Sequence, residues 1–83
     1  MEIGQIVIAK KGRDKGKFFV VTSLEDGYLY LVDGESRVLR RPKKKKVMHV
    51  QQTNTIVDLK VAGRDLQDAD IRKAIKVLLH SPG

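Results

Sequence analysis

The sequence contains no cysteine and only two histidines, His49 and His80. It therefore has no disulfide bond and no cysteine zinc site, and two histidines are too few for a histidine metal site. Its longest apolar runs cover a few residues, far short of the roughly 20 that a membrane span needs. Residues 1–4 show neither the basic start nor the apolar core of a signal peptide. We expect a soluble, cytoplasmic protein with no metal, no other cofactor and no membrane partner.

Catalytic groupings are also lacking. The acidic residues between positions 25 and 35 lie at Asp-Gly turns, where aspartate is common for conformational reasons. No serine has an evident histidine partner, and a histidine in a strand-like segment, such as His49, more often packs or faces solvent than catalyses. Residues 12–17 differ from a phosphate-binding P-loop, because three residues instead of four separate the glycines and Phe18 replaces the required hydroxyl. We expect no enzyme and no small-molecule substrate.

With 83 residues, the chain has room for one domain with a small core. Its 17 lysines and arginines exceed its 10 acidic residues, which gives a net charge of +7. Residues 1–52 hold twelve basic and six acidic groups, whereas residues 53–83 hold five and four. Such an uneven charge favours a polyanionic partner, most often nucleic acid. An anionic membrane would instead require a basic amphipathic helix, and most of these cations lie in expected loops.

The chain is organised around residues 6–24, where apolar runs at 6–8 and 18–21 flank a basic loop (residues 10–17). The β-branched and aromatic residues of the flanks predict two strands. Gly16 is the position where we expect a positive φ, which costs other residues roughly 1–2 kcal/mol. The alternative interpretation is an ordinary glycine turn with solubilising lysines.

Five short strands are predicted, at residues 3–9, 18–24, 28–32, 37–39 and 47–50. Asp26-Gly27 and Asp33-Gly34 are typical of the tight turns between strands. Pro42 ends the fourth strand or marks an edge. Residues 43–46 are expected to be loop, because four adjacent ammonium groups repel one another. So many short strands in so short a chain predict a mainly β fold, a small five-stranded barrel.

The C-terminal part contains one predicted helix, residues 67–79, with apolar positions 71, 74, 75, 78 and 79 on one face. Gln67, Asp65 and Asp68 are alternative N-caps, and residues 81–83 end the helix. Polar residues 51–54 are expected to leave the barrel, and residues 55–61 could be a strand or an extended arm. Because so short a helix is marginal alone, it should dock on the barrel. We expect a barrel at residues 1–52 and a connector with a packed helix at residues 53–83.

Strand alternation places Phe18 and Phe19 on opposite faces of the sheet, and Tyr28 and Tyr30 on the same face. If the intervening leucines point inward, the two tyrosines form an outer platform on which bases could stack. If the tyrosines point inward, they belong to the core. We favour a core position for at least one tyrosine, because a small core uses the bulk that is available.

Two clusters hold twelve of the 17 basic residues. The first, in the basic loop, consists of Lys10, Lys11, Arg13, Lys15 and Lys17. The second consists of Arg37, Arg40, Arg41, Lys43, Lys44, Lys45 and Lys46. On one small barrel, two such clusters can face consecutive phosphates, and the arginines can also stack on bases. The alternative is that these charge runs are only solvated.

The succession of apolar strand, basic loop with Asp14-Lys15-Gly16-Lys17, and apolar strand resembles a KOW motif. Gly16 occupies the position of that family's defining glycine. The segment LVDG at residues 31–34, followed by a basic stretch, resembles the fourteen-e family of large-subunit ribosomal proteins of archaea and eukaryotes. The whole chain is similar to short KOW-containing RNA-binding proteins of some Gram-positive bacteria, most clearly over residues 3–52.

This resemblance implies an SH3-like barrel that binds structured RNA, above all ribosomal RNA, and that associates with the ribosome and its proteins in translation. RNA as the ligand, rather than DNA, comes from the resemblance and not from the charge. An alternative from the same resemblance is a protein-interaction module, since similar barrels in NusG-type elongation factors contact polymerase or ribosomal proteins.

Overall fold

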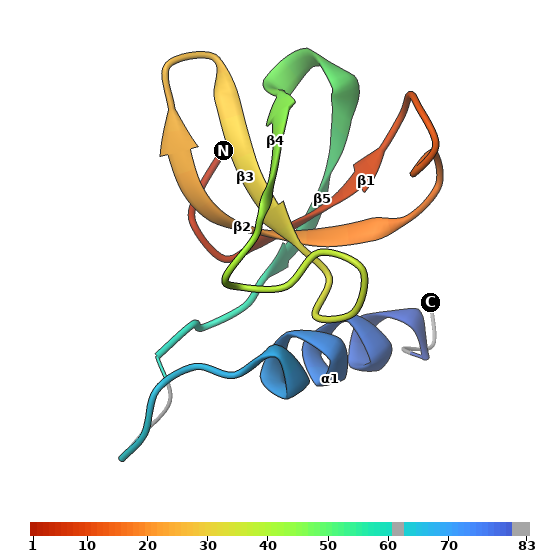
Figure 1. The fold of residues 1–83 in the computed structure, drawn as a ribbon. Helices are drawn as coiled ribbons and strands as arrows, with labels where there is room; N and C mark the ends of the chain where they lie inside the picture. Colours follow the sequence, from red (N-terminus) through yellow and green to blue (C-terminus); the bar gives the residue numbers. More distant parts are fainter. Residues whose placement is uncertain (61–62, 81–83) are drawn as a thin grey trace.

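The computed structural model describes residues 1–60 and 63–80. Five strands form one antiparallel sheet in the order β4-β3-β2-β1-β5 (Figure 1). They are β1 (Gln5–Ala9), β2 (Phe18–Glu25), β3 (Tyr28–Val32), β4 (Lys43–Lys46) and β5 (Val50–Ile56). A 3-10 turn, η1 (Val47–His49), joins the two edge strands, and α1 (Asp68–Leu79) follows the sheet. The predicted mainly β fold with a C-terminal helix is therefore confirmed.

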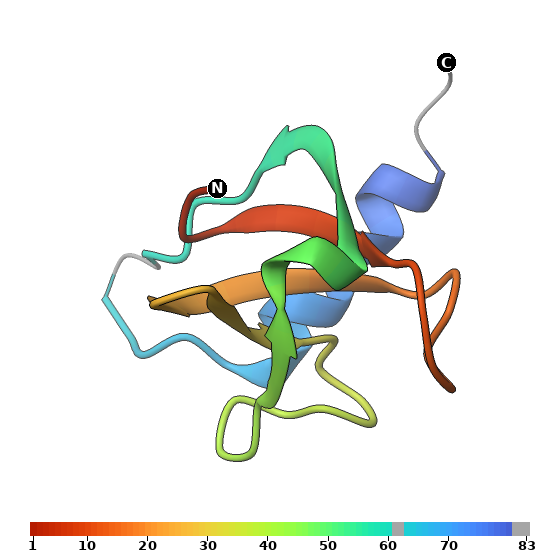
Figure 2. The same cartoon turned by 90° about the horizontal axis from the view of Figure 1, so that it is seen from above.

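The sheet is strongly curled, and α1 lies across one end of it (Figures 1 and 2). Alternation along the strands divides the buried side chains between two apolar layers. The inner layer, inside the curl, consists of Val7, Ala9, Phe19, Val21, Leu29, Leu31 and Val50. The outer layer consists of Ile6, Val20 and Val32 from the sheet with Ile71 and Ile75 from α1. Phe18 borders the outer layer and Phe19 belongs to the inner one, so their predicted opposite orientation is confirmed.

The first three strands lie close to their predicted positions. β3 covers residues 28–32 as predicted, and β2 extends one residue beyond its predicted end. The Asp-Gly turn between them has two residues, because Glu25 pairs with Tyr28. β1 begins at Gln5 rather than at residue 3. The preceding Gly4 has a φ of 92° and donates a backbone hydrogen bond to the carbonyl of Val21 at 2.7 Å, so the chain turns just before the strand.

The prediction of a loop at residues 43–46 is wrong, because these four lysines form the edge strand β4. A strand directs successive side chains to opposite faces, so neighbouring ammonium groups are kept apart. Pro42 directly precedes this strand, which agrees with its predicted place at an edge.

The two remaining predicted strands are wrong in position. Residues 37–39 lie in the loop between β3 and β4, where the Leu39 N–H donates to the Asp68 carboxylate at 2.7 Å instead of to a strand. Residues 47–49 form η1, and β5 begins only at Val50. Residues 51–54 do not leave the sheet, because they belong to β5 and pair with β1, with Gln52 opposite Val7. This edge strand lacks the usual alternation, because the neighbouring Gln51 and Gln52 are both exposed and Val50 is its one buried residue.

Residues 57–60 form an extended arm after β5, one of the two alternatives for this segment. The Val57 N–H donates to the carbonyl of Gly4 at 2.7 Å, and both Val57 and Leu59 pack against the outer layer. Residue 61, the last of the predicted segment, lies outside the described residues. β5 runs across the predicted division at residue 52.

The helix α1 begins one residue after its predicted start, with Gln67 as the N-cap residue. The Asp70 carboxylate accepts a hydrogen bond from the Gln67 N–H at 2.8 Å and pairs with Arg64 at 2.7 Å. The hydrogen bond from Arg64, followed by that from Gln67, lowers the pKa of Asp70 to about 2. Docking through Ile71 is confirmed, whereas Leu79 is 57% exposed, so the predicted apolar face is wrong at its last position. The predicted stop at residues 81–83 lies outside the described residues.

Both tyrosines lie half-buried on the outside of β3, while Leu29 and Leu31 fill the inner layer. The preference for a tyrosine in the core is therefore wrong. The leucines supply the buried bulk, and the Tyr30 hydroxyl remains at the surface, where it donates to Glu25.

Within the described ranges, no helix combines the length and the apolar character that crossing a membrane requires.

Candidate nucleic-acid interface

The basic loop is held by backbone hydrogen bonds at its base. The Ala9 N–H donates to the carbonyl of Lys17 at 3.0 Å, and the Gly16 N–H donates to the carbonyl of Ala9 at 2.8 Å. Gly16 has a φ of 88°, as predicted. The Lys10 N–H donates to the carbonyl of His49 at 2.9 Å, which ties the start of the loop to η1. The loop is therefore fixed to both β1 and the turn before β5.

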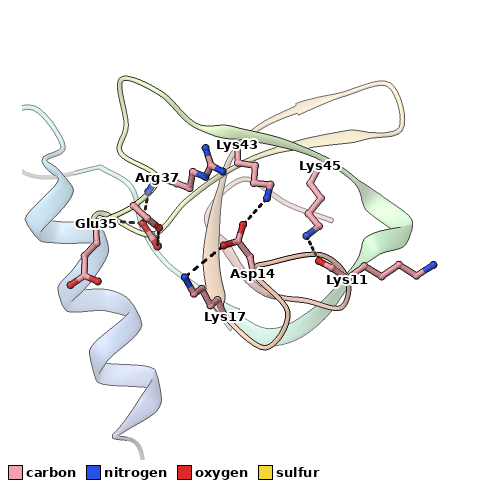
Figure 3. A network of polar contacts seen from close by, with 9 residues as sticks. Lys11, Asp14, Lys17, Glu35, Arg37, Lys43 and Lys45 are labelled. Carbon is pink, nitrogen blue, oxygen red and sulfur yellow. Dashed lines mark hydrogen bonds and ion pairs between the residues drawn. The ribbon is translucent and has the colours of Figure 1, made fainter.

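Asp14 is the anchor of the basic loop on its inner side. This residue is only 7% exposed, and its carboxylate lies 2.6 Å from the ammonium of Lys43 and 3.7 Å from that of Lys17 (Figure 3). The hydrogen bond from Lys43 lowers the pKa of Asp14 against the opposing effect of burial, and the charges of Lys43, Lys17 and Arg37 add to the lowering. Asp14 is thus an ionised group that binds β4 to the loop.

Lys45 makes the second connection between β4 and the basic loop. It is 9% exposed, and its ammonium donates to the carbonyl of Lys11 at 2.8 Å (Figure 3). Burial lowers the pKa of Lys45, and the nearby charge of Lys43 lowers it further. Lys43 and Lys45, both predicted to contact RNA, therefore point into the protein's own loop. Lys44 and Lys46 alternate with them and are exposed on the other face of the strand.

The remaining cations of the loop face outward. Four of its five cationic side chains, those of Lys10, Lys11, Arg13 and Lys15, are exposed and take no part in an ion pair within the described residues, whereas Lys17 is shared with Asp14. The phosphate-binding interpretation of the first cluster thus has a physical basis: the backbone is fixed while the charges remain in water. A preformed cationic loop loses little conformational freedom when an anion binds.

The arginines of the second cluster lie on a separate loop, between β3 and β4. Burial would raise the pKa of Asp33, but hydrogen bonds from the Arg37 N–H, the Glu35 N–H and the Ser36 hydroxyl outweigh it and lower the pKa. The loop is also attached to α1, because Arg72 donates to the carbonyl of Gly34 at 2.6 Å. Arg37 is half-buried, and Arg40 and Arg41 are exposed. The seven residues of the second cluster are therefore divided between this loop and the two faces of β4.

His49 is a member of the interface that the sequence did not single out. It is half-buried in η1, and its pKa is lowered by burial and then by the charges of four surrounding lysines. These are Lys11, Lys46, Lys45 and Lys10, which come from the basic loop and from β4. Positive charge from the basic loop and from β4 therefore acts on the same imidazole.

Asp14 was also missed as an organising residue. The signal for it was present, because Asp14 is the single carboxylate among the five cations of the basic loop.

Comparison of the chain with models of known protein families finds no matching family, and comparison with curated proteins finds no relative.

Proposed function

We propose that this protein is an RNA-binding module, an SH3-like barrel of the KOW type that contacts the phosphates of structured RNA with its basic loop. Ribosomal RNA is the ligand we favour, with association to the ribosome. The observation that carries the proposal is the anchoring of the loop: Asp14, Lys43 and Lys45 fix it, and Lys10, Lys11, Arg13 and Lys15 stay exposed on it.

Two further features support a KOW module. Gly16, at the position of the motif's glycine, has a φ of 88°, and its N–H donates to the carbonyl of Ala9 at the end of β1. The strands form a curled five-stranded antiparallel sheet, whose unpaired edge strands β4 and β5 are joined by a 3-10 turn, and we interpret this sheet as a small, open barrel. The choice of RNA over DNA continues to depend on the sequence resemblance, since phosphate contacts by themselves do not distinguish the two.

A second candidate is a protein-interaction module of NusG type. It is favoured by two apolar side chains near the end of α1 that the fold leaves uncovered, Val77 at 64% and Leu79 at 57% exposure. They are few, and single exposed apolar residues are common on protein surfaces. We favour RNA binding, because hydrogen bonds hold the backbone of the basic loop that carries the exposed cations.

The test is the affinity for a structured RNA measured over a salt series. Replacing Lys10, Lys11 and Lys15 with Gln should weaken binding and reduce the slope of log affinity against log salt by about 3, since each lost phosphate contact removes close to one unit. The matched control replaces Lys60, Lys73 and Lys76 with Gln and removes the same charge from the connector and α1. A loop variant that keeps the wild-type slope would show that these lysines are only solvated.

A further inference from the structure

The outer face of the sheet is covered by α1 at only one end. Along β3, Val32 lies beneath the helix in the outer layer with Ile71. Tyr28 and Tyr30 project from the same face of the strand by its two-residue period, but they lie beyond the helix and are half-buried. As far as residues 1–60 and 63–80 show, the two half-buried tyrosines are therefore the largest side chains of this face beyond the helix.

Each of these tyrosines lies opposite a lysine of the neighbouring edge strand. Tyr30 pairs with Lys44 and Tyr28 pairs with Lys46 across β3 and β4. We call this set of four residues the tyrosine face. The lysines on it are the exposed members of β4, in contrast to those bound to the basic loop. On this surface, each tyrosine of β3 thus lies beside a lysine of β4.

The rings are held in position by charged neighbours. The Lys44 ammonium lies 4.6 Å from the centre of the Tyr28 ring and 5.9 Å from that of Tyr30. Glu25 accepts a hydrogen bond from the Tyr30 hydroxyl and pairs with Lys44 at 3.5 Å. The Lys44 and Glu25 side chains are 48% and 54% exposed, and an exposed ion pair contributes only about 0–1 kcal/mol. Lys44 can therefore leave the rings at small cost when another group binds there.

The surface beside Tyr28 is apolar and shallow. A hollow of about 430 Å³ is lined by Gly27, Tyr28, Lys46, Val47 and Met48. Met48 is 71% exposed and Val47 is 37% exposed. The hollow is therefore lined mainly by apolar groups, with the single cation of Lys46 among them, and this combination complements a planar base that carries a phosphate.

We propose that the tyrosine face binds one or two unpaired nucleotides of RNA, with bases stacked on Tyr28 and Tyr30 and phosphates on Lys44 and Lys46. The inference rests on the proposed RNA-binding function. It adds that the RNA ligand contains a single-stranded segment beside its structured part. Aromatic rings bind bases by stacking in a sequence-tolerant manner, and nearby cations follow the backbone. A purely apolar peptide would leave the two lysines without partners, so the charge favours a nucleic acid.

The experiment compares a blunt RNA hairpin with the same hairpin carrying six unpaired adenosines, and it follows the tyrosine ring signals by NMR. Replacing Tyr28 and Tyr30 with Leu keeps apolar bulk but removes the rings. This variant should lose about tenfold or more in affinity for the overhang RNA. Its affinity for the blunt hairpin should stay the same, and so should the slope of its log affinity against log salt. The matched control replaces both tyrosines with Phe, which keeps the rings and should bind the overhang like wild type.

The outcomes separate this proposal from the proposed function. If the Leu variant binds the overhang RNA as tightly as wild type, and the salt-dependent binding of the hairpin is intact, only the proposal for the tyrosine face is overturned. Failure of wild type to bind either RNA, with unmoved ring signals, would overturn both proposals. The tyrosine ring signals could instead shift when a purified ribosomal protein is added and not when hexaadenylate is added. That result would also overturn the proposal for the tyrosine face and would identify it as a contact with protein.

Discussion

The Lys43 ammonium lies 2.6 Å from a carboxylate oxygen of Asp14, a residue 29 positions earlier in the sequence. Asp14 lies in the basic loop that carries the first cluster and Lys43 belongs to the second cluster, so the pair joins this loop to β4. Lys43 therefore does not add its charge to the outer surface in the way that Lys46 on the same strand does. The number of basic residues in a charge run is thus a poor measure of how many can reach a phosphate.

The first prediction concerns Asp14→Asn. It should lower the free energy of unfolding by about 1–2 kcal/mol at neutral pH, because the hydrogen bond between charged groups is lost. The pKa of Asp14 in the folded protein is lowered from 3.8 by the Lys43 hydrogen bond, so its stabilising effect is complete above the unfolded-state pKa and is lost as pH falls through the folded-state pKa. The difference in stability between wild type and variant should therefore shrink below about pH 4.

Thermal unfolding between pH 2 and pH 7 measures this difference. Asp65→Asn is the control, because it removes the same charge from an exposed position in the connector. A constant difference across the whole pH range would contradict an ionised Asp14 as the anchor of the basic loop.

The second prediction separates the two faces of β4. Lys43→Gln should lower Tm by several degrees, since about 1 kcal/mol shifts the Tm of a domain of this size by about 4–8 °C. Lys46→Gln removes the same charge three residues further along the strand, from an exposed position on its other face, and should leave Tm unchanged while weakening RNA binding. The measurement is a thermal melt and an RNA titration for each variant. Equal Tm values would show that the pair with Asp14 contributes no stability.

The third prediction compares two glycines with similar φ values, 88° at Gly16 and 81° at Gly34. No atom lies within 4 Å of a methyl group added at Gly16, so Gly16→Ala should cost about 1–2 kcal/mol from backbone strain alone. A methyl group at Gly34 would overlap the Asp68 carbonyl and lie 2.7 Å from Arg72 Cγ. Gly34→Ala should therefore cost more and loosen the docking of α1. Denaturant unfolding checks the order, which equal losses would contradict.

The sequence was sufficient for features set by local pattern. The bounds of β3, the Asp-Gly turn and the helix follow from periodicity and turn chemistry, and the positive φ of Gly16 follows from the loop around it. β4 could not be predicted in this way. Four lysines repel one another in isolation, and they form a strand because Asp14 and the carbonyl of Lys11 bind alternate ammonium groups from 29 and 34 residues away.

The same limit explains the candidate site. The exposed cations of the basic loop could be named from the sequence, because their exposure depends only on the loop. Which lysines of β4 are available to RNA depends on long-range contacts that composition does not record. The position of the tyrosines likewise depends on whether leucine or tyrosine fills the inner layer, and both choices satisfy the same alternation.

The fourth prediction uses His49 as a reporter of phosphate binding. In the free protein its pKa is lowered by burial and by the charges of the surrounding lysines. A phosphate bound to Lys10 and Lys11 would offset these charges and make the imidazolium less unfavourable. The pKa of His49 should therefore rise when RNA binds, and by linkage the affinity should increase as pH falls through the range between its free and bound pKa values.

NMR titration of the histidine ring protons, with and without a structured RNA, measures this change directly. His80, just after the end of α1, is the internal control, and its ring-proton signals should not move when RNA is added. His49→Gln should bind RNA with little dependence on pH between 5 and 8, whereas wild type should bind more tightly at the acidic end of that range. If RNA binds while the titration of His49 stays the same, the phosphates do not lie against Lys10 and Lys11. The basic loop would then lose its assigned role, and the arginines between β3 and β4 would become the next residues to replace.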